Sequence, residues 1–68
     1  MTMQIHLNGE TKQVASALTA AQLIEDLGLT GQRLAMEVNQ EILPRSEYVS
    51  YQFQPNDRVE IVHAIGGG

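Results

Sequence analysis

Hydrophobic and polar residues alternate at the start of the chain. Met3, Ile5 and Leu7 are separated by polar residues, which is the period-two pattern of a strand with one buried face. Asn8-Gly9 is typical of a two-residue turn, and Thr11–Ala15 is predicted to return as a second strand. The chain therefore opens with an antiparallel hairpin.

The hydrophobic period changes between Thr19 and Gly28. The apolar residues there recur at the spacing of one helical face, namely Ala20, Leu23, Ile24 and Leu27. Thr19 is a favourable N-cap, and Gln22 three residues later completes a capping-box pattern. Gly28 suits the left-handed conformation that ends many helices. Together these signals predict a helix over Thr19–Gly28.

The second half of the chain predicts three further extended segments. Arg33–Asn39 alternates again, and a turn leads to a short strand at Ile42-Leu43 that Pro44 ends, because proline provides no backbone donor. Arg58–Ala64 is predicted to be the last strand. The stretch between them, Arg45–Phe53, is the least regular part of the chain.

The apolar residues of that irregular stretch are expected to attach it to the core as a short turn or 3₁₀ segment. They are Tyr48, Val49, Tyr51 and Phe53. Pro55-Asn56-Asp57 follows and is a strong turn signal. The last strand should then begin at Arg58, with Val59 and Ile61 facing the core.

This order of elements predicts an α+β fold, with a mixed sheet of four or five strands and one main helix packed on one face. A right-handed crossover would place the last strand beside the first, in parallel and in the middle of the sheet. That arrangement is the β-grasp, or ubiquitin-like, fold. A chain of 68 residues has room for one core. We therefore expect a single domain over residues 1–64 and a flexible glycine-rich tail over residues 65–68.

Composition disfavours several classes of function. The chain has eight acidic and four scattered basic residues, a net charge of −4, which disfavours binding to nucleic acids or anionic membranes. It has no cysteine, and so no disulfide or thiolate zinc site. No apolar run approaches a membrane span, and the first residues do not resemble a signal peptide. The expected location is the cytoplasm.

No catalytic or metal-ligating residues are predicted, because His6 and His63 lie far apart and no cysteine nucleophile is present. We therefore do not expect an enzyme. The remaining chemistry lies in Gly66-Gly67-Gly68. Residues without a Cβ can enter a narrow channel, and an extended chain from Ile65 to Gly68 reaches roughly 13 Å. A terminal carboxylate is ionised and a poor electrophile, so an ATP-using partner would have to activate it.

Two segments resemble the ThiS family, the sulfur carriers of thiamine biosynthesis. They are Val38–Tyr48, with the sequence VNQEILPRSEY, and Asp57–Gly68, with the sequence DRVEIVHAIGGG. The resemblance extends over the whole chain. It departs from the family pattern at Asn56, where glycine is frequent, and at Gly66, which is an additional glycine.

The resemblance implies a mechanism in which this chain is a substrate and binds no cofactor. A ThiF-like adenylyltransferase of the ubiquitin-activating type would use ATP and Mg²⁺ to adenylate the Gly68 carboxylate. A cysteine desulfurase or another persulfide donor would supply the sulfur of a thiocarboxylate. A ThiG-like thiazole synthase would then take up that sulfur. Ile65, Gly66 and Gly67 would thread through the partner's active site.

In carriers of this kind, the sheet face opposite the helix and the strand before the tail dock on the activating enzyme. The candidate docking residues are Val62, Tyr51, Phe53, Arg45 and Arg58. Core packing is the alternative for the two aromatic residues, and a solvated surface charge is the alternative for the two arginines.

Three other functions fit parts of the pattern. The small subunit of molybdopterin synthase uses the same tail chemistry, but such subunits tend to be longer and lack the Asn-Gln…Pro-Arg-Ser stretch. A ubiquitin-like modifier would instead join target lysines by an isopeptide bond. A plain β-grasp interaction module would make no use of its glycines.

Overall fold

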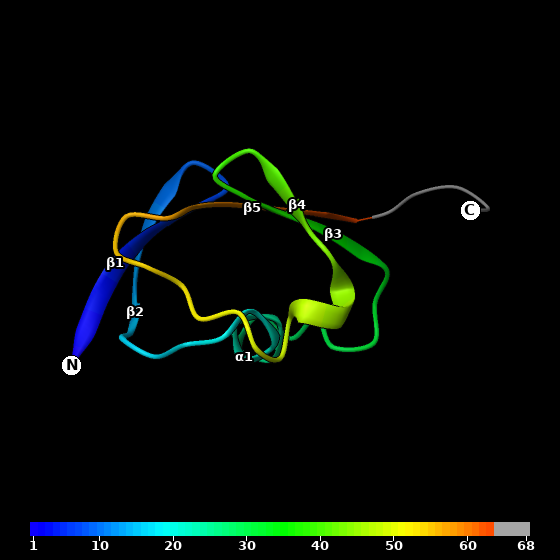
Figure 1. Ribbon diagram of the computed structural model, residues 1–68, viewed down its shortest axis with the longest axis horizontal. Coiled ribbons are helices and arrows are strands. Elements are labelled where there is room, and N and C mark those ends of the chain that lie inside the picture. Colours follow the sequence, from blue (N-terminus) through cyan, green and yellow to red (C-terminus); the bar gives the residue numbers. More distant parts are fainter. Residues whose placement is uncertain (64–68) are drawn as a thin grey trace.

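The computed structural model describes residues 1–63, and its elements follow the predicted order (Figure 1). In chain order they are β1 Thr2–Leu7, β2 Glu10–Ala15, α1 Ala20–Asp26, β3 Leu34–Val38, β4 Glu41–Leu43, the 3₁₀ turn η1 Arg45–Glu47 and β5 Arg58–His63. The predictions for Ala64, as the end of the last strand, and for the tail over residues 65–68 lie outside the described residues.

The five strands form one mixed sheet in the order β2-β1-β5-β3-β4. β5 is parallel to β1 and antiparallel to β3, and α1 lies across one face of the sheet (Figure 1). This topology confirms the predicted β-grasp fold. It places β5, the strand that precedes residues 64–68, between two hydrogen-bonded neighbours and not at an edge of the sheet.

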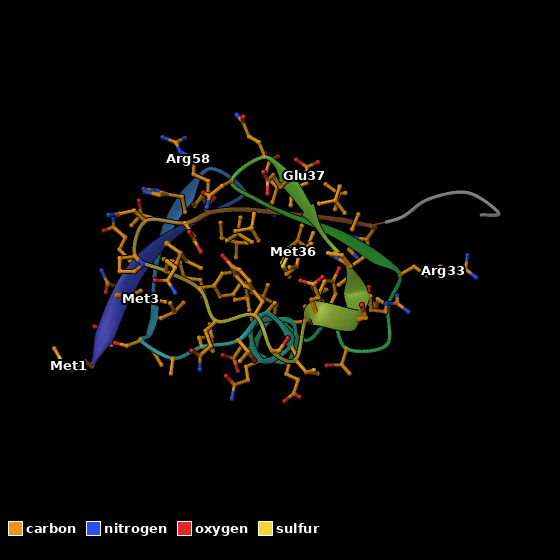
Figure 2. All side chains as sticks on the ribbon, in the orientation of Figure 1. Met1, Met3, Arg33, Met36, Glu37 and Arg58 are labelled. Atoms are coloured by element: carbon orange, nitrogen blue, oxygen red, sulfur yellow. The ribbon has the colours of Figure 1, made fainter. Side chains whose placement is uncertain are left out.

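The core lies between α1 and the inward face of the sheet. Its largest fully buried side chains are Phe53, Ile5, Leu23, Met36 and Val59. Figure 2 shows Met36 pointing from β3 into the space between the sheet and α1. The three central strands, β1, β5 and β3, contribute one of these residues each, and α1 contributes another. Only Phe53 comes from a segment without regular structure, the loop that precedes β5.

Both predicted two-residue turns adopt the left-handed backbone that they require. The φ angles are 50° and 85° at Asn8 and Gly9, and 54° and 72° at Asn39 and Gln40. Glycine has no Cβ, and the short side chain of asparagine can hydrogen-bond to the nearby backbone, so both tolerate positive φ; Gln40 has neither advantage. The turn chemistry thus fixes the β1–β2 hairpin locally, while the β3–β4 hairpin requires further contacts.

The ends of α1 form as predicted, although the helix is shorter than the predicted span. Thr19 Oγ1 accepts a hydrogen bond from the Gln22 N–H at 3.2 Å, and Gln22 Oε1 accepts one from the Thr19 N–H at 2.9 Å. Gly28 has φ 73°, and the Leu29 N–H donates to the Ile24 carbonyl at 2.9 Å. These are a capping box and a Schellman C-terminus.

The irregular segment around η1 is attached to the N-terminus of α1 mainly through its backbone. The Ala20 N–H donates to the Tyr51 carbonyl at 3.0 Å, and the Ala21 N–H donates to the Tyr48 carbonyl at 2.9 Å. These bonds satisfy two N–H groups that have no partner inside the helix. The prediction that Val49 packs into the core is wrong, since its side chain is 75% exposed.

A buried carboxylate connects the start of β5 to the rest of the fold. Asp57 is 5% exposed. Its oxygens accept hydrogen bonds from Asn39 Nδ2 at 3.0 Å, the Tyr51 hydroxyl at 2.8 Å and the Gln54 N–H at 2.9 Å. The Arg58 N–H in turn donates to Asn39 Oδ1 at 3.0 Å. Three donors compensate the loss of water around the charge, and together they join the β3–β4 turn to the loop before β5.

A second side chain extends the pairing of β5. β1 pairs with β5 only at His6 and Leu7. Beyond Leu7, the side chain of Asn8 forms hydrogen bonds with the backbone of β5. Its Oδ1 accepts from the Ile61 N–H at 2.9 Å, and its Nδ2 donates to the Ile61 carbonyl at 3.3 Å. One amide thus satisfies both backbone groups of Ile61 on the side where β1 has ended.

Replacement of the buried carboxylate should destabilise the fold. Asp57→Ala leaves three donors without an acceptor, so we expect the free energy of unfolding to fall by about 3 kcal/mol. Urea denaturation followed by circular dichroism measures this change. Asp26→Ala, which removes an exposed carboxylate from the end of α1, is the matched control and should change stability by less than about 0.5 kcal/mol. Equal stabilities of the two variants would contradict the assignment.

Stability should also fall at high pH because of Tyr51. Burial, the hydrogen bond to Asp57 and the negative charge of that carboxylate raise the pKa of Tyr51 to about 12. The unfolded chain releases this proton near pH 10, so the stabilisation is complete below about pH 10 and is lost as the pH rises towards 12. Urea denaturation at pH 8 to 11.5 should show a shallower decline for Tyr51→Phe than for the wild type. Identical declines would contradict this prediction.

Candidate functional site

The residues predicted to carry the chemistry, Ile65, Gly66, Gly67 and Gly68, lie outside the described residues. The structure describes what precedes them, which is the end of β5 and the sheet around it. His63 is the last described residue, and its position depends on contacts with β3 and with the loop between α1 and β3.

The end of β5 is aligned by β3 up to its last residue. Val62 is opposite Ala35, and His63 is opposite Leu34. The side chain of His63 adds a contact outside the ladder, because its Nε2 lies 2.7 Å from Gln32 Oε1. Residue 63 therefore has a defined position and direction relative to the sheet.

The sheet face opposite α1 carries a mixed apolar and acidic surface. Alternation along β5 directs Val59 and Ile61 inward and leaves Val62, which is 57% exposed, on the other face. The registers of β3 with β5 and β4 place four other residues around Val62 on this face. We call the five residues the outer patch: Ala35, Glu37, Ile42, Glu60 and Val62.

The predicted docking residues do not form one surface. Val62 and Arg58 occupy alternate positions of β5 on the outer face. Figure 2 shows Arg58 and Glu37 on the side of the sheet away from α1. Arg45 instead belongs to η1 and lines a surface hollow with residues of α1 and of the loop after it, including Gln32. Only two of the five candidates therefore lie together on the sheet face.

The two aromatic candidates have structural roles. Phe53 is 1% exposed, so the prediction that it docks a partner is wrong, because it offers no surface for contact. Tyr51 is half-buried against Phe53, with ring centroids 5.4 Å apart in an edge-on arrangement, and its hydroxyl donates to Asp57. Core packing, the alternative named for these residues, accounts for the positions of both rings.

Four residues of the outer patch were not predicted from the sequence, namely Ala35, Glu37, Ile42 and Glu60. Glu37, Ile42 and Glu60 become neighbours because β3 pairs with β4 on one side and with β5 on the other. The alternation along each strand indicates which face each residue takes. The register that brings them side by side depends on strand pairing, which the sequence pattern does not report.

Within residues 1–63, no three side chains of histidine, cysteine, aspartate or glutamate gather as metal ligands. In the same part of the chain, no helix is long and apolar enough to cross a membrane. The two histidines lie far apart, because His6 of β1 is opposite Arg58 at the start of β5, whereas His63 is the last residue of β5.

Two relatives are much longer proteins that contain a similar segment. The thiazole synthase of Magnetococcus marinus is 38% identical over 66 residues, and that of Paramagnetospirillum magneticum is 36% identical over 66 residues. Each match includes 97% of this chain but only 20% of the synthase. The chain thus spans about a fifth of the length of these two proteins.

Other matches cover nearly the whole of this chain and the full length of the other protein. The sulfur carrier protein ThiS of Escherichia coli is 32% identical over 66 residues, which is 97% of this chain and 100% of that protein. A crystal structure of a thiamine biosynthesis protein (ThiS) from Geobacter metallireducens has a TM-score of 0.84 at 28% identity, with 97% of this chain and 100% of that chain covered. The profile of the ThiS family matches residues 5–68. The chain therefore belongs to the ThiS family.

Proposed function

We propose that this protein carries sulfur for the thiazole ring of thiamine. Membership of the ThiS family is the observation that carries the proposal, because the matched region extends from residue 5 in β1 to Gly68. The match to the E. coli sulfur carrier over its full length supports the same role. The protein would act as a carrier and as a substrate of partner enzymes, not as a catalyst.

The proposed chemistry takes place on the carboxylate of Gly68. An adenylyltransferase of the ubiquitin-activating type binds ATP and Mg²⁺ and joins the carboxylate to AMP with release of pyrophosphate. A persulfide sulfur, formed by a cysteine desulfurase or another donor, displaces AMP. A thiol then reduces the resulting acyl disulfide and leaves a thiocarboxylate. Activation is required because the ionised carboxylate is a poor electrophile.

Thiazole synthase is the proposed acceptor of the sulfur. Two proteins named thiazole synthase contain a segment that matches nearly the whole of this chain, which supports a functional link between the carrier and the synthase. A thiocarboxylate suits the transfer because it is a better nucleophile than a carboxylate. Family membership also supports the thiamine pathway over the molybdopterin alternative.

The central position of β5 in the sheet supports the proposal that the strand presents residues 64–68 to a partner enzyme. β5 is paired on both sides, and Asn8 and Gln32 add side-chain contacts near its end. A rigid strand before a slim tail limits the orientations from which residues 64–68 start, which lowers the entropy lost when a partner takes them up. Val62 lies on the sheet face next to the start of the tail, and Arg58 lies on the same face at the beginning of β5; both remain proposed docking residues.

Intact mass spectrometry tests the proposed chemistry directly. The chain is incubated with its adenylyltransferase, ATP, Mg²⁺, a cysteine desulfurase, cysteine and a dithiol reductant. Conversion of the carboxylate to a thiocarboxylate should raise the mass by about 16 Da, the difference between sulfur and oxygen. Omission of ATP is the control and should abolish the change. A stable adduct to a lysine of another protein would instead indicate a modifier.

Deletion of Gly68 should abolish sulfur loading without changing the stability of the fold. The variant should take up no sulfur, because the terminal carboxylate is displaced by one residue, about 3.5 Å, along the tail. Its urea denaturation curve should match that of the wild type within about 0.5 kcal/mol, because a terminal glycine has no side chain to pack in a core. Normal sulfur loading, or a large loss of stability, would contradict this division of roles.

A further inference from the structure

The two edges of β5 are covered to different extents. Towards β3, the ladder reaches the last described residue, with His63 opposite Leu34. Towards β1, residue pairing ends at Leu7, and the Asn8 N–H adds one more hydrogen bond, to the Val59 carbonyl at 2.9 Å. β1 ends there, so no strand of residues 1–63 covers the second half of β5 on this edge.

The side chain of Asn8 occupies this open edge. A primary amide has an acceptor oxygen and a donor nitrogen on one carbon, so a single side chain can bind a backbone N–H and a backbone C=O together. Asn8 does so at Ile61, at 2.9 Å and 3.3 Å, although the two residues are 53 positions apart. Aspartate, which has no donor when ionised, and glycine, which has no side chain, could not make this pair of contacts.

The turn by itself does not require an amide at position 8. Asn8 has φ 50° and Gly9 has φ 85°, and glycine adopts such angles at least as readily as asparagine. Asn56 provides a comparison, because it also has a left-handed backbone, with φ 67°, but its side chain forms no hydrogen bond within residues 1–63. The amide of Asn8 thus has a use that turn geometry does not explain, and this use lies on the strand that precedes the tail.

We propose that Asn8 is a positioning residue for the activation of Gly68. By holding Ile61 from the open edge, its amide fixes the direction in which β5 leads into residues 64–68. The inference rests on the proposed function, in which the terminal carboxylate attacks the α-phosphorus of ATP in the adenylyltransferase and pyrophosphate leaves. Asn8 touches no reacting atom. It raises the fraction of docked carriers whose terminus is aligned for this attack.

The kinetics of adenylation test this role through Asn8→Gly, which keeps the turn and removes the amide. The exchange of labelled pyrophosphate into ATP is measured with the adenylyltransferase, Mg²⁺ and increasing concentrations of the carrier. We expect kcat to fall about three- to tenfold, because fewer docked carriers are aligned. KM for the carrier should change by less than about twofold, because the docking surface is intact. Asn56→Gly makes the same substitution at another left-handed asparagine and should leave both constants within about twofold of the wild type.

Hydrogen exchange provides a readout of the strand itself. In Asn8→Gly, the amide proton of Ile61 should exchange about tenfold faster or more, because its acceptor is lost. The N–H of Val62 points to the other edge, where β3 protects it, and should exchange at the rate of the wild type. A general loss of stability would accelerate both protons. The variants are compared at a temperature where circular dichroism shows them folded.

Four outcomes would overturn the positioning role. They are an unchanged kcat in Asn8→Gly, a rise of KM alone, an equal fall of kcat in Asn56→Gly, and an Ile61 amide proton that exchanges at the rate of the wild type. A rise of KM alone would make Asn8 a docking contact. A wild-type chain that supports no exchange of pyrophosphate would contradict the proposed function, and the positioning role with it. The two failures are distinguishable, because only the second one is seen in the wild type.

Discussion

The buried carboxylate of Asp57 joins parts of the chain that are separated by up to 18 residues. It binds Asn39 in the β3–β4 turn, Tyr51 in the irregular segment and the backbone of Gln54. A charge this deeply buried is tolerated only where donors replace the lost water. Here the donors belong to the β3–β4 turn and to the segment that precedes β5. Both must take their positions for β5 to pair at the centre of the sheet. The same aspartate thus links the geometry of the loops to β5, the strand on which the proposed delivery of the tail depends.

The remaining contacts of β5 follow from its central position. Backbone pairing with β1 stops at Leu7, and the amide of Asn8 completes it at Ile61. On the other side, β3 pairs with β5 through to His63, where Gln32 adds a side-chain contact. β5 consequently has hydrogen-bond partners on both sides along most of its length. Such a strand is suited to presenting the segment that follows it, which is the physical basis of the proposed carrier role.

The two faces of the sheet differ in burial and in composition. The inward face is closed by α1 and by Phe53, and its polar network has no unsatisfied buried side-chain atom in the described part of the chain. The outer face keeps Ile42 and Val62 exposed around two opposed carboxylates. Like charges that face each other on neighbouring strands destabilise a sheet, so packing of the core does not explain this pair of residues.

Local signals were sufficient to predict the hairpins, the caps of the helix and the inward residues of each strand, because period, capping and turn chemistry involve residues a few positions apart. The β-grasp topology also followed, since few arrangements bury one helix on such a sheet. Long-range contacts were not predictable in the same way. The burial of Asp57 and the exposure of Val49 depend on how the segment around η1 meets α1. For Phe53 the sequence left two positions open, in the core or on a docking surface, and only the structure decides for the core. Glu37 and Glu60 lie 23 positions apart, and only the register between β3 and β5 makes them neighbours.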